Sequence, residues 1–396
     1  MTEASEIIRI AARGDGVTAD GKHVAGGVPG DKLLADGTLE AGPNRADPPC
    51  AHFGQCGGCQ LQHADEDALR QFVTERVTFQ AEQHGIAVST LLDTHLSPAN
   101  SRRRATLHAL RTTKGAVLGF REGSSHKIVD LKECHILRPE LVKLLPALRK
   151  LVAVHGGKRA VDIELTLADQ GVDCSIKHLE LEGLEATEAA LEFAESNALA
   201  RLTLDHGYGP ETQWEPEPVT ITLSGRSVGM PAGSFLQATQ DGENVLTADS
   251  KAWIGHADTI ADLFAGLGTF AFSLAGPAKV LAAEASRDAH LACKAASAGL
   301  PMGAMHRDLF RNPLQPDELN RFQAVLLDPP RAGAKEQVAQ IADSSVNQVV
   351  YISCNPVSWA RDCTKLVEAG FHLEKLRAVG QFRWSTHVEL TSYWTR

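Results

Sequence analysis

The sequence predicts a mixed α/β protein whose C-terminal half, residues 228–396, forms an open parallel sheet. Two observations carry this expectation. Short apolar runs are separated by segments long enough for helices, and they lie at residues 259–263, 279–283, 324–327 and 348–352. Such alternation builds parallel sheets that are covered by helices on both faces. The last two runs also end in loops dense with polar and reactive side chains, and ligands of such sheets bind at the carboxyl ends of the strands.

Residues 1–45 are expected to form a short antiparallel β unit. Apolar runs at residues 7–10 and 24–28 alternate with glycine turns, which is typical of β-hairpins. The stretch has too few residues for a full five-stranded barrel. We therefore expect a reduced barrel, with a loosely ordered hairpin as the alternative.

Residues 46–95 combine a cysteine-rich loop with a predicted amphipathic helix at residues 65–84. The loop has the spacing C-x5-C-x2-C at Cys50, Cys56 and Cys59, and Cys134 is the best candidate for a fourth ligand. Structural zinc sites more often contain two close pairs of ligands, whereas three clustered cysteines and one distant partner are typical of an iron–sulfur cluster. The pattern favours a [4Fe-4S] cluster, with zinc or free thiols as alternatives.

Residues 96–227 are predicted to be rich in β-strands and strongly basic. Strand-like runs lie at residues 105–110, 116–120, 163–167 and 172–176, with a helical run at 139–154. Between residues 97 and 160 there are fourteen Lys and Arg against four acids, although the whole chain has a formal charge of −10. A basic stretch on an acidic chain indicates a nucleic-acid partner, and solvated surface charge is the alternative.

The composition is that of a folded protein of two or three domains, since 43% of the 396 residues are hydrophobic. No run approaches the roughly 18 apolar residues of a membrane helix, and the first residues are unlike a signal peptide. We expect a cytoplasmic protein without a membrane partner. Its eight cysteines favour metal binding or catalysis over disulfides.

A glycine turn and an acidic residue predict the type of cofactor. The strand at residues 259–263 leads to Gly266 and Gly268, and the next strand ends in Glu284. Glycine allows a cofactor to approach the backbone closely, but the third glycine of the dinucleotide fingerprint is absent. Glu284 is placed to accept hydrogen bonds from ribose hydroxyls. These features favour a nucleoside cofactor without a pyrophosphate, and S-adenosylmethionine is the natural candidate.

Five motifs resemble those of the RNA 5-methyluridine (uracil-C5) methyltransferase family, and they occur in the family's order. They are F-x-Q at 235–237, D-L-F-x-G-x-G at 262–268, D-P-P-R-x-G at 328–333, S-C-N-P at 353–356 and H-V-E at 387–389. The resemblance implies a Rossmann-like class I S-adenosylmethionine-dependent methyltransferase domain at residues 228–396. It also implies a β-rich central RNA-binding domain and a TRAM/OB-like N-terminal unit. The cysteine pattern resembles the iron–sulfur branch of the family, which implies 23S rRNA as the substrate.

The resemblance also implies roles for the matched residues. Cys354 would be the nucleophile that adds to carbon 6 of uracil, and Glu389 the general base that removes the proton from carbon 5. The cofactor-binding residues would be Gln237, Phe264, Gly266, Gly268, Thr269, Glu284 and Asp328. The RNA and its flipped base would contact Phe235, Arg331, Arg102, Arg103 and Arg104. We expect the cluster to be structural, because none of these steps moves an electron.

Other classes of protein are alternatives to an RNA uracil-C5 methyltransferase. An amino methyltransferase usually has an aromatic residue where this chain has Arg331, and a cytosine-C5 enzyme usually has Pro where it has Ser353. A tRNA substrate and a non-catalytic iron–sulfur RNA-binding module are the remaining alternatives. We expect a monomer without a protein partner.

Overall fold

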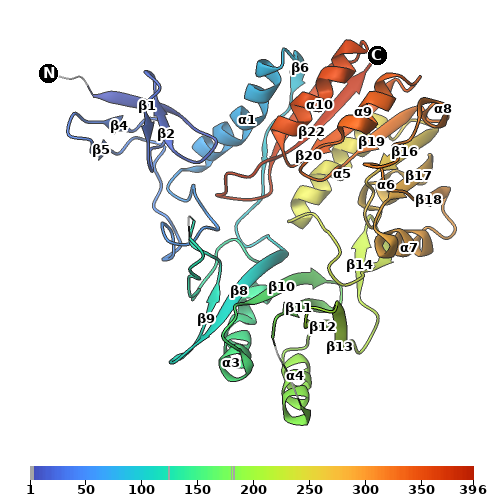
Figure 1. The fold of residues 1–396 in the computed structure, drawn as a ribbon. Helices are drawn as coiled ribbons and strands as arrows, with labels where there is room; N and C mark the ends of the chain where they lie inside the picture. The colour runs from blue at the N-terminus through green and yellow to red at the C-terminus, as the bar shows by residue number, and fades with distance from the viewer. Residues whose placement is uncertain (1–3, 124, 180, 182) are drawn as a thin grey trace.

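The structure is a computed structural model that describes residues 4–123, 125–179, 181 and 183–396. Residues 1–3, with which the expected N-terminal unit begins, lie outside the described residues, as do residues 124, 180 and 182 of the expected central domain. Figure 1 shows a small sheet near the N-terminus, a central domain below it, and a large sheet with its helices at the upper right.

The C-terminal half is built around a nine-stranded sheet with the order β18-β17-β16-β19-β20-β22-β21-β6, in which β7 (His95–Leu96) also pairs with β21. Its parallel strands are β16 (Thr259–Leu263), β17 (Lys279–Glu284), β18 (Met302–His306), β19 (Ala324–Leu327) and β20 (Gln348–Ser353). The predicted fold class and the four predicted strands are confirmed. β22 (Glu389–Thr395) lies antiparallel between β20 and β21 (His372–Gly380). It is therefore an interior strand of the sheet.

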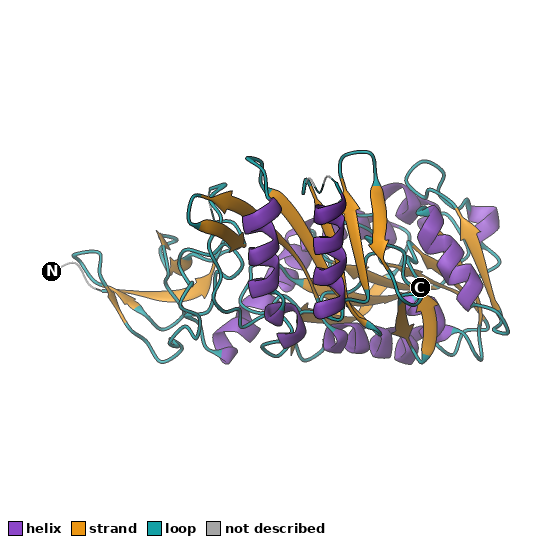
Figure 2. Cartoon of the chain, turned by 90° about the horizontal axis from the view of Figure 1, so that it is seen from below, coloured by secondary structure: helices purple, strands orange, loops and turns teal. Residues whose placement is uncertain are grey.

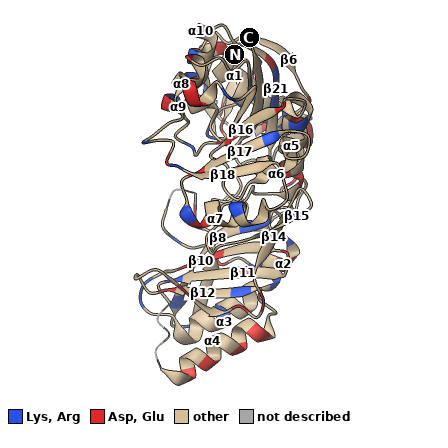
Figure 3. Cartoon of the chain, turned by 90° about the vertical axis from the view of Figure 1, so that its right-hand side faces the viewer, with Lys and Arg blue, Asp and Glu red and all other residues tan. Residues whose placement is uncertain are grey.

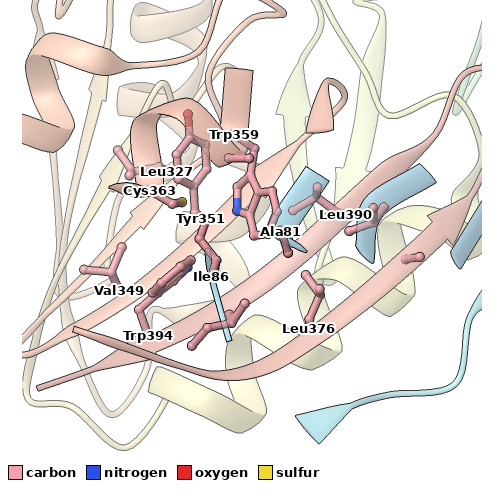
Figure 4. Packing of buried hydrophobic residues seen from close by; sticks show 14 of the residues in the cluster. Ala81, Ile86, Leu327, Val349, Tyr351, Trp359, Cys363, Leu376, Leu390 and Trp394 are labelled. Carbon is pink, nitrogen blue, oxygen red and sulfur yellow. The ribbon is translucent and has the colours of Figure 1, made fainter. Parts of the chain in front are cut away.

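Both faces of this sheet are apolar and covered by helices. The first face packs against α1 (Glu66–Gln83), α9 (Lys335–Ala342) and α10 (Pro356–Glu368), and the second against α5 (Gln240–Ile254), α6 (Thr269–Leu274) and α7 (Arg287–Ala296). Successive residues of a strand point to opposite faces, so Val325 lies in the first core and Leu326 in the second. Figure 4 shows the first core, where Trp359 of α10 packs near Trp394 of β22 with ring centroids 6.3 Å apart. This packing fixes the ends of the strands.

Residues that precede the central domain complete the large sheet. β6 (Val88–Leu91) pairs in parallel with β21, and α1 covers the first face. The helix predicted over residues 65–84 is confirmed, and Asp65 caps it by accepting a hydrogen bond from the Ala68 amide. The apolar side of this helix is buried at Leu69, Phe72, Val73 and Val77, whereas Phe79 is exposed. The structure thus attaches residues 66–91 to the large sheet, although we expected a separate segment at 46–95.

The N-terminal unit is a five-stranded antiparallel sheet with the order β3-β2-β1-β4-β5. Its strands are β1 (Ser5–Ile10), β2 (Gly16–Thr18), β3 (His23–Val24), β4 (Lys32–Leu33) and β5 (Leu39–Glu40). Three of them have only two residues, which is how five strands fit a stretch that we considered too short for them. The buried Asp31 carboxylate accepts hydrogen bonds from the amides of Val28 and Gly42 and pairs with Arg45. Figure 2 shows this unit projecting from one end of the molecule.

The central domain contains a six-stranded sheet with the order β13-β12-β11-β10-β8-β9. Its strands are β8 (Arg104–Thr112), β9 (Gly115–Gly119), β10 (Val161–Ala168), β11 (Gly171–Lys177), β12 (Arg201–Asp205) and β13 (Pro210–Trp214), and its helices are α2 (Pro139–Lys143), α3 (Leu145–His155) and α4 (Leu184–Ser196). The helices α3 and α4 lie side by side (Figure 2) and share the apolar core of this sheet. We did not predict α4. A hairpin of β14 (Thr220–Leu223) and β15 (Arg226–Gly229) follows the domain.

None of the helices in the described part of the chain is long and apolar enough to span a membrane.

Candidate active site

Three of the expected site residues lie where the parallel strands of the large sheet reach their carboxyl ends. Asp328 follows β19 and Cys354 follows β20, and these strands are parallel neighbours. Glu389 begins β22, which runs antiparallel beside β20. The first residue of an antiparallel strand lies beside the last residue of its neighbour. The order of the strands therefore brings together residues that are far apart in the sequence.

Side-chain hydrogen bonds link two of these residues through a pair of buried amides. Gln237 Nε2 donates to Asp328 Oδ2 at 3.1 Å. Gln381 Nε2 donates to Gln237 Oε1 at 2.9 Å and to Glu389 Oε2 at 2.7 Å. Both glutamines are at most 3% exposed. Our sequence analysis missed Gln381, because it belongs to none of the five motifs and only its contacts reveal it.

The two carboxyl groups at the ends of this network have raised pKa values. The pKa of Glu389 is raised to about 8, first by burial and then by the negative charge of Asp328, against the lowering effect of the hydrogen bond from Gln381. Burial raises the pKa of Asp328 to about 7, although the hydrogen bond from Gln237 lowers it. A carboxyl group that titrates near neutral pH is suited to proton transfer. The pair can therefore exchange a proton with a bound ligand.

The Cys354 thiol is half-buried and protonated in the free protein. Its pKa is raised to about 11, mainly by burial and then by the charges of Glu389 and Asp328, whereas Arg331 lowers it. Only a thiolate is an effective nucleophile. Cys354 must therefore lose its proton when a substrate binds, and a proton on either neighbouring carboxyl group favours that loss.

The predicted cofactor loop connects β16 to α6. Phe264 and Gly266 both have positive φ angles, of 64° and 55°. A Cβ atom added to Gly266 would meet no atom within 4 Å, so the loop borders open space. The Gly266 amide donates to Glu284 Oε2 at 2.8 Å, which holds this carboxylate beside the loop. Open space next to a glycine turn and an acid fits a nucleoside cofactor.

The second glycine of the loop has a different role from the first. Gly268 precedes α6, whose first residue is Thr269, and its φ is 93°. An added Cβ would lie 2.7 Å from the ring of Phe272 and 2.9 Å from the sulfur of Cys293. Gly268 is therefore required by the packing of the loop against α6 and α7.

The three consecutive arginines connect the central domain to the F-x-Q segment. Arg103 is only 4% exposed, pairs with Glu243 of α5, and donates from Nε to the backbone carbonyl of Gln237 at 3.1 Å. Its guanidinium is thus enclosed by protein and not open to RNA. The Arg104 guanidinium lies over the ring of Phe235, 4.9 Å from its centroid. Phe235 itself is 64% exposed, as expected for a residue that stacks on a base.

A cavity beside the amide network is lined by two arginines and an aromatic ring. It has an empty volume of about 250 Å³, and Gln381, Arg102, Phe382 and Arg383 contribute to its wall. The Arg102 guanidinium lies 5.4 Å from the centroid of Phe382. The Arg383 Nε atom is buried and has no hydrogen-bond partner among the described residues. Arg331, the remaining expected RNA contact, is exposed near Cys354.

The four cysteines predicted to bind a cluster line a second hollow, which is open to solvent, together with apolar residues that include Phe120 and Leu131. The Gly57 amide in their loop donates to the carbonyl of Arg121 at 2.9 Å, and a Cβ added to Gly57 would lie 2.8 Å from that oxygen. This close approach requires glycine. It holds the loop with Cys50, Cys56 and Cys59 against the segment that leads to Cys134.

The four cysteines offer sulfur ligands, which both zinc and iron–sulfur clusters accept. The described residues contain no group of three or more His, Cys, Asp or Glu arranged to hold a single metal ion. In a [4Fe-4S] cluster each cysteine binds a different iron atom, so the sulfurs need not converge on one point. The pKa of Cys59 is raised to about 12, mainly by burial and also by the charges of Cys134 and Cys56. Cys59 is therefore a neutral thiol in the free protein, and it would lose its proton only on binding a cationic centre.

Comparison with known proteins first identifies the class. The crystal structure of the Pyrococcus abyssi tRNA (uracil-54, C5)-methyltransferase in complex with S-adenosyl-L-homocysteine matches 99% of both chains with a TM-score of 0.75 at 19% identity. The fold is therefore that of a Rossmann-like S-adenosylmethionine-dependent methyltransferase.

Relatives in sequence define the family. An uncharacterized RNA methyltransferase of Zymomonas mobilis is 48% identical over 99% of both chains. The 23S rRNA (uracil(1939)-C(5))-methyltransferase RlmD of Chromohalobacter salexigens is 32% identical over 90% of this chain and 78% of its own length. A family model described as tRNA (Uracil-5-)-methyltransferase matches residues 303–396. The chain belongs to the RNA uracil-C5 methyltransferase family.

Proposed function

We propose that this protein transfers a methyl group from S-adenosylmethionine to carbon 5 of a uridine in 23S rRNA, with Cys354 as nucleophile and Glu389 as general base. The observation that carries this proposal is the meeting of Cys354, Asp328 and Glu389 at the carboxyl-terminal edge of the parallel strands. The family to which the chain belongs supports the reaction, and the RlmD relative supports the choice of 23S rRNA.

The first chemical step activates the pyrimidine. Carbon 5 of uracil is a poor nucleophile while the ring stays conjugated. The Cys354 thiolate adds to carbon 6, and the electrons of the double bond between carbons 5 and 6 move onto carbon 5 and its carbonyl neighbour. Bound S-adenosylmethionine supplies an electrophilic methyl group on a sulfonium sulfur. Gly266 and Glu284 would hold its nucleoside part, because Gly266 borders open space and the carboxylate of Glu284 is hydrogen-bonded beside it.

The second step releases the product. The electron pair on carbon 5 forms the bond to the methyl group, and the electrons of the sulfur–methyl bond stay on the sulfur of the departing S-adenosylhomocysteine. Carbon 5 now carries both the new methyl group and its original hydrogen. Glu389 removes that proton, the electrons of the carbon–hydrogen bond restore the double bond, and the carbon–sulfur bond breaks with its electron pair returning to Cys354. The raised pKa of Glu389, about 8, suits a base that must take and then return a proton near neutral pH. Asp328 and Gln237 would orient the uracil or the cofactor through their polar atoms.

The RNA would approach the face that carries the arginine-lined cavity and Phe235. The two guanidiniums of Arg102 and Arg383 can neutralise phosphates, and an exposed aromatic ring can stack on a base. The far end of the central domain has the opposite character, because α4 carries Glu185, Glu188, Glu192 and Glu195 (Figure 3). We therefore infer that α4 points away from the RNA.

Methyl transfer to RNA from cells that lack the protein tests this function. The protein should convert uridine to 5-methyluridine in 23S rRNA and leave the tRNA pool unlabelled, and label confined to tRNA would favour the alternative substrate. Cys354→Ala should abolish transfer, while Cys174→Ala, which changes a buried thiol of the central domain, should retain it. RNA containing 5-fluorouracil should form a covalent complex with the protein. If no complex forms and Cys354→Ala stays active, the covalent mechanism is wrong.

We further propose that Cys50, Cys56, Cys59 and Cys134 hold a [4Fe-4S] cluster that joins the N-terminal loop to the central domain. The shared hollow and the close approach of Gly57 to Arg121 support this proposal. Protein purified without oxygen should contain iron and sulfide in equal amounts and absorb visible light. Cys134→Ser should lose both elements, whereas Cys363→Ser should keep them. Zinc in place of iron in the purified protein would contradict the proposal.

A further inference from the structure

We propose that Gln381 is a positioning residue for the general base Glu389. Through its hydrogen bond, Gln381 selects the oxygen of Glu389 that receives the proton from carbon 5. This inference rests on the proposed function. It concerns a residue outside all five motifs, on the loop that connects β21 to β22.

The orientation of the Gln381 amide is fixed by a backbone group. The amide N–H of Ala238 donates to Gln381 Oε1 at 3.1 Å. A backbone N–H is only a donor, so Gln381 cannot rotate its amide by 180° without losing this bond. Its Nε2 therefore faces the other way, and its two hydrogens go to Gln237 Oε1 and Glu389 Oε2.

The same logic continues along the network. Because Gln237 Oε1 accepts from Gln381, Gln237 Nε2 must be the group that faces Asp328. The backbone amide of Ala238 thus sets the direction of three further hydrogen bonds, which are the two donated by Gln381 and the one donated by Gln237. Ala238, Gln237, Gln381 and Glu389 are buried and Asp328 is half-buried, and leaving a buried donor or acceptor unpaired costs about 1–3 kcal/mol. The network has a single well-satisfied arrangement.

This arrangement makes the two oxygens of Glu389 different. Oε2 accepts a hydrogen bond from Gln381, while no hydrogen bond to Oε1 is found among the described residues. A proton placed on Oε2 would neutralise that oxygen and make it a weaker acceptor for the hydrogen bond from Gln381. Oε1 is therefore the oxygen that takes the proton from carbon 5, while the electrons of the carbon–hydrogen bond form the double bond and Cys354 leaves.

The ionisation of Glu389 should depend strongly on the hydrogen bond from Gln381, because the other groups around Glu389 disfavour its charge. The titratable groups that face it are Asp328 from the loop after β19 and Cys354 from the loop after β20. Asp328 raises the pKa of Glu389, and Gln381 is the group that lowers it. Loss of the donor should therefore leave less of the base ionised at neutral pH.

Gln381→Met tests this inference, because methionine has a similar length but no donor. We expect kcat at pH 7 to fall by about 10- to 100-fold, and the acidic limb of the kcat profile to move to higher pH. The methylated covalent complex with ordinary uracil-containing RNA should accumulate on denaturing gels, because its breakdown requires the base. The fall in kcat should exceed any change in the KM for RNA and in the affinity for S-adenosylmethionine, since Gln381 also contributes to the wall of the arginine-lined cavity and donates to Gln237. Gln381→Glu, which adds a second carboxyl group, should move the acidic limb further in the same direction.

The matched control is Gln337→Met. Gln337 is also buried, at 1% exposure, but it bonds only to the backbone of Leu314 and lies outside the site. This variant should keep the wild-type kcat and pH profile. If Gln381→Met has the same kcat and the same pH profile as Gln337→Met, the inference is wrong. Failure of the proposed function itself would differ, because the wild-type protein would then form no complex with 5-fluorouracil RNA.

Discussion

Arg103 of the central domain and Glu243 of α5 form an ion pair in which the two side chains are 5% and 4% exposed. The same guanidinium also donates to the carbonyl of Gln237. One arginine thus joins two domains and holds the segment that carries the first amide of the network. The ion pair of Arg103 should contribute to stability and its hydrogen bond to Gln237 should contribute to activity, so variants can measure the two contributions separately.

Arg103→Met should destabilise the protein by about 3–5 kcal/mol, because it leaves the Glu243 carboxylate buried and unpaired. Arg103→Met combined with Glu243→Leu should recover most of this loss. Activity should stay low in both variants, since neither restores the hydrogen bond to Gln237. Chemical denaturation and methyl-transfer assays measure the two effects. Arg311→Met is the control, because this side chain is 89% exposed and should change stability by less than about 0.5 kcal/mol. Full activity in the double variant would contradict the positioning role.

Glu389→Gln should abolish turnover and yet stabilise the protein at high pH. The folded-state pKa of Glu389, about 8, lies above the ordinary value of 4.5. The folded protein therefore binds more protons than the unfolded chain between these values, so the wild-type protein loses stability as pH rises through this range. The gain in melting temperature from Glu389→Gln should be near zero at pH 4.5 and largest above pH 8.

Glu318→Gln provides a control of opposite sign. Its carboxylate is paired with Arg307, which lowers the pKa of Glu318. Removing that charge should destabilise the protein at neutral pH, and the difference should vanish as pH falls below the lowered pKa. Equal pH dependence in the two variants would show that burial does not raise the pKa of Glu389.

Arg383→Ala should weaken RNA binding without affecting the cofactor. If a phosphate lies in the arginine-lined cavity, the slope of log affinity against log salt should decrease by about 1. The affinity for S-adenosylmethionine should be unchanged, because the glycine loop does not contribute to this cavity. Filter binding over a range of salt concentrations measures the slope. An unchanged slope, matching that of Arg311→Ala, would exclude a phosphate contact by Arg383.

Gly266→Ala and Gly268→Ala should have different effects, the first on the affinity for the cofactor and the second on the stability of the protein. Both glycines have positive φ, so both substitutions strain the backbone by about 1 kcal/mol. The methyl group at residue 266 enters open space and should mainly reduce the affinity for S-adenosylmethionine. The methyl group at residue 268 collides with Phe272 and Cys293 and should mainly reduce stability. Calorimetric titration and thermal unfolding measure the two quantities, and the reverse pattern would contradict the cofactor position.

The strands that carry the site could be predicted because buried parallel strands are continuous apolar runs. Each run ended in a recognisable motif, so Asp328 and Cys354 were placed at strand ends from the sequence alone. β18 and β21 were missed, and the burial of β18 is only partial, with Gly303 and His306 exposed. The interior position of β22 could not be predicted, because nothing in its own residues shows that β21 and β6 lie beyond it in the sheet.

Roles that depend on distant partners could not be predicted. The partner of Arg103 is 140 residues away and the partner of Gln381 in the F-x-Q segment is 144 residues away. The basic stretch was also overestimated as a free surface, because five of its cations pair with carboxylates. These are Arg103, Lys127, Lys132, Arg138 and Arg149. Counting charges along a sequence does not reveal which of them are already neutralised.

The pairing of β6 with β21 has a consequence for biosynthesis. Val88 lies opposite Leu373, so β6 cannot pair with β21 until residue 373, which is synthesised 285 residues after residue 88, has left the ribosome. The central domain, whose strands lie between these two segments, can fold during that wait. The methyltransferase body therefore matures last, and a chain that stops short of residue 373 leaves α1 without the strand that it covers.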